Sequence, residues 1–98
     1  MLNTNYIGAV VKILEAPKKK IINSKTLVLR FRVQLAQLPY VRVVNLIVWG
    51  SSAHMLLNCY KVNDYILVEG YSSIKVTKTF QNRSLEKVTI TAVNVYPF

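Results

Sequence analysis

The side chains with the clearest chemistry in this sequence are cations and flat aromatic rings. The chain has 98 residues, with 13 Lys and Arg against 4 Asp and Glu, which gives a formal net charge of +9. Arg30 and Arg32 are two residues apart, and Trp49 is the only tryptophan. Ammonium and guanidinium groups neutralise phosphates, and aromatic rings stack on exposed bases. The sequence therefore predicts a polyanionic partner, with single-stranded nucleic acid as the chemistry that uses both groups.

The candidate contacts from residue type alone form three groups, each with a plainer alternative. They are the run Lys18, Lys19 and Lys20; Arg30 and Arg32 with Trp49; and Tyr71, Lys75, Lys78, Phe80, Arg83 and Lys87. A lysine run is also typical of a solvated loop, and the two arginines could belong to an ordinary wet sheet face. Trp49 could equally be a core residue of an apolar strand.

Catalytic groups are sparse. The four carboxylates are Glu15, Asp64, Glu69 and Glu86, and none is spaced to make a local acid–base pair. His54 follows Ser51 by three residues, but a nucleophilic triad also needs an orienting acid and an oxyanion site. His54 and Cys59 do not make a metal cluster, and three glycines do not make a phosphate loop. We expect a protein that is not an enzyme and uses no cofactor or metal.

Composition bounds the class of protein further. The hydrophobic fraction is 52%, so the chain is no disordered basic tail, and no apolar run is long enough to span a membrane. The excess of apolar residues, notably in the first and third expected strands, favours a homodimer or homotetramer. One cysteine and the absence of a signal-peptide pattern fit a reducing compartment. Residue types with AT-rich codons outnumber those with GC-rich codons by 36 to 15, which indicates an AT-rich genome such as an organelle's.

Periodicity predicts the elements that must position these groups. Alternation over Lys25 to Gln37 is the clearest: Leu27 to Leu35 would bury one face, and Arg30 and Arg32 would lie on the other. Further strands are expected over residues 6–15, 41–49 and 65–72, and a hairpin over 74–80 and 85–95 can continue the last of these. A short helix follows Gly50 through about Tyr60, capped by Ser51 or Ser52. Lys18 to Lys20 are expected in a loop after Pro17.

These elements predict an all-β protein. Five strands, with one short helix between the third and the fourth, match the five-stranded Greek-key barrel of the OB fold. The whole chain, residues 1–98, is expected to form one domain.

Two segments carry a resemblance to a known family. The stretch from Val43 to Gly50 reads VVNLIVWG, and the stretch from Lys61 to Gly70, after a short helix, reads KVNDYILVEG. With the opening ILEAP at residues 13–17, these resemble the bacterial single-stranded-DNA-binding protein (SSB) family, and most closely its small tailless members from algal plastid genomes. The resemblance covers nearly the whole chain, although each motif is short.

The resemblance implies roles for particular residues. Trp49 matches a position at which the family stacks a base, Asn45 matches a usually basic contact position, and the loop with Lys18 to Lys20 lies near the family's groove. Tyr40 falls near a further family aromatic. Val43 stands where the family often has a second Trp, and Thr77 or Lys78 stands near another stacking position, so we expect weaker and more charge-dependent binding. The sequence lacks the acidic tail with which bacterial members recruit replication proteins, although such partners remain open.

The leading hypothesis is sequence-nonspecific binding of single-stranded DNA in replication, recombination or repair of an organelle or other small genome. A plastid stroma is the expected location, with bacterial cytoplasm as the alternative. A second hypothesis is a primosomal accessory OB protein of the PriB type, and a third is an RNA-binding OB protein.

Overall fold

The backbone is dominated by strands that pair into one continuous sheet. The computed structural model describes residues 5–36, 42–78 and 84–98. In this part of the chain the elements are β1 (Asn5–Ile13), β2 (Lys18–Ile22), β3 (Thr26–Leu35), β4 (Val43–Trp49), α1 (Gly50–Cys59), β5 (Tyr65–Lys78) and β6 (Ser84–Pro97). The predicted all-β class, with one short helix between the third and fourth expected strands, is confirmed.

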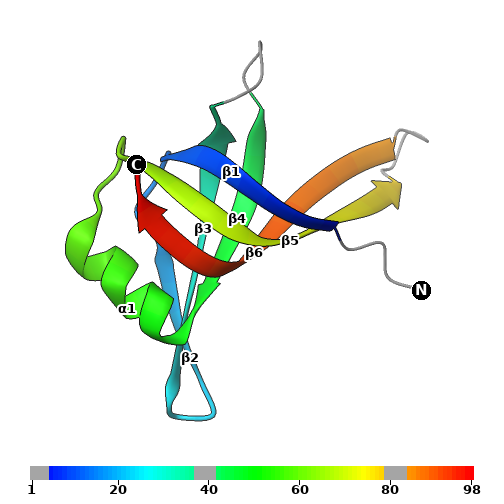
Figure 1. Ribbon diagram of the computed structural model, residues 1–98. Coiled ribbons are helices and arrows are strands. Elements are labelled where there is room, and N and C mark those ends of the chain that lie inside the picture. Colours follow the sequence, from blue (N-terminus) through cyan, green and yellow to red (C-terminus); the bar gives the residue numbers. More distant parts are fainter. Residues whose placement is uncertain (1–4, 37–41, 79–83) are drawn as a thin grey trace.

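The sheet closes into a ring. Its strand order is β1-β5-β6-β4-β3-β2, and β1 also pairs with β3 through residues 11–13, so five strands form a closed circuit (Figure 1). The pairing of β4 with β6 is parallel, and the other pairings are antiparallel. Strand β2 lies outside the circuit. It pairs with residues 26–30 of β3, on the same edge of β3 that pairs with β1 farther along, at residues 33–35. The described residues thus contain six strands, where the sequence predicted five.

The core lies inside this ring, as the alternation in β3 predicted. Leu27, Leu29, Phe31 and Val33 are buried, while Arg30 and Arg32 are exposed. Strand β4 follows the same rule, since Val44, Leu46 and Val48 point inward. Because a strand's side chains alternate between its two faces, every inward residue fixes its neighbours on the outer surface. The buried set therefore determines which polar groups can form a site.

Helix α1 packs against β3, β4 and β6 through one apolar stripe. Ala53 and Leu56 are buried, and Leu57 and Tyr60 pack against the core. The expected cap by Ser51 or Ser52 is wrong: the N-cap is Trp49, in an extended conformation and without a side-chain cap bond. Gly50 adopts a φ of +60°, a left-handed conformation that glycine reaches without strain, and it turns the chain from β4 directly into the helix. The geometry of this turn leaves no serine in the capping position.

The segment with the three lysines is a strand, contrary to the predicted loop. Lys18 to Ile22 pair antiparallel with residues 26–30 of β3. The connecting turn uses Asn23 and Ser24 at φ of 54° and 59°, and Lys25 N–H donates to the carbonyl of Ile22 at 3.1 Å. Consecutive lysines have low β propensity, which is why the sequence favoured a loop. On an exposed edge strand, however, lysines are common because their charge discourages further strand pairing.

Strands β5 and β6 form a long antiparallel pair that extends beyond the ring (Figure 1). The sequence allowed the hairpin arm after Ser72 to continue the preceding strand, and β5 does run unbroken from Tyr65 to Lys78. A register shift follows Glu69, which pairs with Asn94, because Gly70 pairs with Ala92 and Val93 is left over as a bulge. The bulge lies within the ring, because Gly70 also pairs with Ile7 of β1, and Ala92 with Val48 of β4.

Candidate nucleic-acid interface

Cations from separate strands meet on the outer surface of β2, β3, β4 and β6. Strand register places Lys18 beside Arg30 and Ile47, and Lys20 beside Val28 and Trp49. Arg32 lies beside Asn45 in the next row. We call this surface the cationic face and define it as Lys18, Lys20, Arg30, Arg32, Asn45, Trp49 and Lys87. These side chains come together because each strand turns its apolar residues inward and its polar residues outward.

One half of the cationic face is a polar hollow of about 290 Å³. It is lined by Glu15, Lys18, Arg30, Phe31, Arg32, Asn45 and Lys87. Four cations therefore surround one carboxylate and one amide. The hollow is open to solvent and can accept an anionic group without burying it.

The other half is a more apolar hollow of about 190 Å³ beside Trp49. Its lining residues are Lys20, Ile22, Val28, Arg30, Ile47 and Trp49. The Trp49 side chain is 45% exposed, which decides the alternative left open by the sequence: it is a surface residue and not part of the core. A hollow lined by an exposed aromatic ring, aliphatic side chains and the cations Lys20 and Arg30 offers stacking and charge together. Arg30 lines both hollows and so joins the two halves.

Arg32 is held by a carboxylate. Its Nε donates to Glu15 Oε2 at 3.2 Å and its Nη2 donates to Oε1 at 3.2 Å. Its backbone N–H also donates to Oε2, at 2.8 Å. These hydrogen bonds and the charge of the guanidinium lower the pKa of the Glu15 carboxyl. The side-chain hydrogen bonds and the charge of the carboxylate raise the pKa of Arg32. Arg30, two residues earlier on the same strand face, makes no such ion pair in the described part of the chain.

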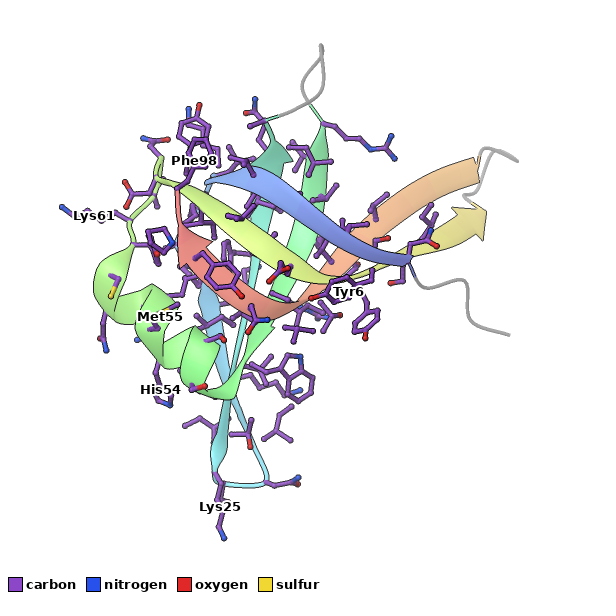
Figure 2. All side chains as sticks on the ribbon, viewed as in Figure 1. Tyr6, Lys25, His54, Met55, Lys61 and Phe98 are labelled. Carbon is purple, nitrogen blue, oxygen red and sulfur yellow. The ribbon has the colours of Figure 1, made fainter. Side chains whose placement is uncertain are left out.

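Aromatic residues continue across the outer surface next to this face. Thr91 of β6 pairs with Ile47 on one side and with Tyr71 on the other, and Tyr71 pairs with Tyr6. The rings of Tyr6 and Tyr71 meet edge to face, with centroids 5.1 Å apart and an interplanar angle of 73°. Tyr6 lies on the side of the ring of strands away from α1 (Figure 2). On the same strands, a hydrogen bond to the Glu69 carboxylate raises the pKa of Tyr96.

The structure brings together half of the residues that the sequence singled out. Lys18, Lys20, Arg30, Arg32, Asn45, Trp49 and Lys87 share the cationic face, and Tyr71 lies one strand beyond it. Lys19 is opposite Leu29 in the register and so occupies the other face of β2. Lys75 and Lys78 lie in β5, where their backbones pair with Lys87 and Ser84 of β6, respectively. Tyr40, Phe80 and Arg83 lie outside the described residues.

Sequence reasoning missed the partners of these residues. Glu15 was noted only as a carboxylate, although it binds the side chain and the backbone of Arg32. Ile22, Val28 and Ile47 line the hollow beside Trp49 and were not singled out. The missing signal is strand register, because a sequence pattern shows which face a residue takes but not which residue lies beside it.

The rest of the described chain offers fewer reactive groups. No cluster of three or more His, Cys, Asp or Glu side chains occurs within it, and His54 and Cys59 are both exposed on α1. A third hollow, lined by residues that include Tyr60, Asp64 and Phe98, lies near the C-terminal end of the chain, and burial raises the pKa of Tyr60 there.

Among the residues that the structure describes, α1 is too short to cross a membrane, and no other helix is a candidate for a membrane span.

The closed circuit of five strands, with a helix after the third of them, defines an OB-fold protein, as expected. Solved structures with this fold match nearly the whole chain. The SSB domain of a Synechococcus sp. protein has a TM-score of 0.65 and 20% identity over 98% of this chain and 96% of its own. The mitochondrial single-stranded DNA binding protein Rim1 of S. cerevisiae has a TM-score of 0.77 and 9% identity, covering 96% of this chain and 94% of its own. A small single-stranded DNA-binding protein from Streptomyces coelicolor has a TM-score of 0.70 and 17% identity, with coverage of 99% and 96%.

A sequence comparison adds one relative to these folds. A Trieres chinensis protein, ycf41, named as a single-stranded DNA-binding protein, is 27% identical over 100 residues, which cover 96% of this chain and 88% of that protein. No protein-family model matches the sequence. The chain is thus similar in sequence to one protein named as a single-stranded DNA-binding protein and in fold to SSB domains, in agreement with the resemblance seen in its sequence.

Proposed function

We propose that this chain binds single-stranded DNA without sequence preference, through the cationic face. The observation that carries the proposal is that Arg30 lines two hollows: one is lined mainly by cations, and the other is lined by Trp49 and aliphatic side chains. Nonspecific binding of a single strand needs a cationic track for phosphates and a ring on which bases stack, and this face supplies both. The names of the similar proteins point the same way.

The path of a bound strand follows from the register. Phosphates would lie over Lys18, Arg30 and Lys87, and a base would stack on Trp49. Tyr71 would offer a further ring beyond Thr91. Each stacked base contributes about 1–3 kcal/mol in such sites. The protein would act by binding alone, without catalysis.

The direct test is the double variant Trp49→Ala/Arg30→Ala, measured against oligo(dT). We expect at least a tenfold loss of affinity, since removing one stacked base costs about 1 kcal/mol or more and one phosphate contact is lost as well. The matched control is Tyr65→Ala/Lys61→Ala, which also removes one exposed ring and one cation but leaves the cationic face intact. Equal binding by the first variant and the parent would contradict this assignment of the interface.

We further propose that the chain works as a homodimer or homotetramer. In the described part of the chain, residues 5–9 of β1 pair only with β5, so one edge of this segment is free for a second copy. Tyr6 and Val43 expose 53% and 48% of their surface, which is apolar area that a subunit contact would cover. Light scattering gives the answer directly: a monomer at micromolar concentration would contradict the proposal, and a dimer would favour the primosomal type of OB protein.

The proposed setting is a plastid, in replication, recombination or repair of its genome. The AT-rich residue composition and the similarity to the Trieres chinensis protein support this location. A preference for oligo(U) over oligo(dT) would favour the RNA-binding alternative instead.

A further inference from the structure

The outer edge of β3 changes partner at Arg32. Its pairing with β2 ends at Arg30, opposite Lys18, and its pairing with β1 begins at Val33, opposite Ile13. Between these points the carbonyl of Arg32 accepts from Leu14 N–H at 3.2 Å. Its N–H donates to the Glu15 carboxylate at 2.8 Å. The Glu15 side chain therefore takes the place of a strand carbonyl where the ladder is interrupted.

The same carboxylate also fixes the Arg32 side chain. Oε1 and Oε2 accept from Nη2 and Nε, both at 3.2 Å, in the two-pronged geometry that guanidinium groups use for carboxylates and phosphates alike. One of the two edges with which Arg32 could bind a phosphate in this way, the Nε and Nη2 edge, is thus already occupied. Because both groups remain charged, they add no net charge to the face.

The Glu15–Arg32 pair bears on binding because it lies in the polar hollow of the cationic face. Glu15 and Arg32 line the same hollow as Lys18, Arg30 and Lys87. An anion that enters the hollow meets three cations without a carboxylate partner of their own in the described structure and one cation that is neutralised. The Glu15 carboxylate in the lining of the hollow also repels phosphates.

We propose that Glu15 is a positioning residue that limits the affinity of the cationic face for nucleic-acid phosphates, by holding and neutralising Arg32. Arg32 then serves as a bridge within the sheet, and Lys18, Arg30 and Lys87 are the phosphate contacts. This inference rests on the proposed function. Its consequence is that the face releases a bound strand more readily than its count of cations suggests.

The decisive variant is Glu15→Gln, because a glutamine oxygen can still accept the Arg32 N–H while the charge is removed. We expect oligo(dT) affinity to rise about three- to tenfold at low salt, and the log–log salt slope to steepen by about 0.7 as Arg32 takes up one phosphate. The matched control is Glu69→Gln, which makes the same charge change on β5 outside the hollow. Its smaller gain measures the effect of net charge alone.

The double variant Glu15→Gln/Arg32→Gln separates the bridge from a direct contact. It removes both charges, so affinity and salt slope should return to those of the parent. A double variant that binds clearly more weakly than the parent would show that Arg32 contacts phosphate already, and would overturn the inference. Glu15→Gln binding no more tightly than Glu69→Gln would overturn it too. If the parent itself fails to bind oligo(dT), the proposed function falls as well, so the two failures are told apart.

Discussion

Arg30 and Arg32 carry the same guanidinium group and lie on the same face of β3, but their neighbours differ. Arg30 joins the two hollows, whereas Arg32 is tied by side chain and backbone to Glu15. The difference arises from the connection between β1 and β2, residues 14–17, because this segment places Glu15 next to Arg32 and not next to Arg30. At this scale the function of a residue is set by its partner more than by its type.

The Glu15–Arg32 pair has a consequence for stability that depends on pH. The pKa of Glu15 in the folded state is lowered below its ordinary value of 4.5, with Arg32 as the main cause and Lys18 as a minor one. The pair therefore stabilises the fold above that ordinary value, and the contribution is lost as pH falls through the lowered folded-state pKa.

Urea unfolding of the parent and of Glu15→Gln at several pH values measures this contribution. We expect the parent to be slightly more stable at neutral pH, since exposed ion pairs contribute little, and the difference to vanish in acid. A difference that grows as the pH falls would contradict this account of the pair.

Among the elements, the β5–β6 pair depends on one glycine. A Cβ on Gly70 would overlap the backbone oxygen of Thr91, and backbone atoms cannot move aside as a flexible side chain can. The close approach occurs at the bulge that sets the register of β6 beside β4, and so the position of Thr91 and Lys87 relative to the cationic face. The bulge in the β5–β6 pair therefore helps to determine where the residues of β6 lie in the candidate site.

We expect Gly70→Ala to destabilise the protein by about 3 kcal/mol, because overpacking against backbone cannot relax cheaply. Gly8→Ala is the matched control: it lies in the neighbouring strand, opposite Glu69, and nothing lies within 4 Å of its added Cβ. Thermal unfolding of both variants gives the comparison. Similar melting temperatures for the two would mean that the bulge accommodates a side chain.

The elements also show how far the sequence could predict the fold and the site. Alternation from Leu27 to Val33 predicted the inward residues of β3 and the exposure of Arg30 and Arg32, although Val28 on the outer face is buried as well. The apolar stripe of Ala53 and Leu56 predicted which side of the helix packs on the core. Strand β2 was not predicted, because consecutive lysines are favourable in a strand only at an exposed edge of a sheet, and the sequence does not show that β2 is an edge strand. The bond of Glu15 to Arg32 escaped because it spans 17 residues and depends on ring closure.

At the scale of the whole molecule, the ring gathers on one face groups that are scattered through the sequence. Lys18, Arg30, Trp49 and Lys87 come from four strands, and the pairing of β2, β3, β4 and β6 side by side in the sheet makes them neighbours. The formal charge of +9 raises the rate of encounter with any polyanion, duplex or single-stranded. The exposed ring of Trp49 is what would distinguish unstacked bases from a duplex.

Because Trp49 is the only tryptophan, its fluorescence reports on the proposed site without a label. The most direct test titrates it with oligo(dT), oligo(U) and duplex DNA at two salt concentrations. We predict strong quenching by oligo(dT), weaker quenching by duplex, and an affinity that falls with salt with a log–log slope of about −2 if Lys18, Arg30 and Lys87 each neutralise one phosphate. Unchanged Trp49 fluorescence with all three, together with no mobility shift, would contradict the account and leave the OB fold with a role in protein contacts alone.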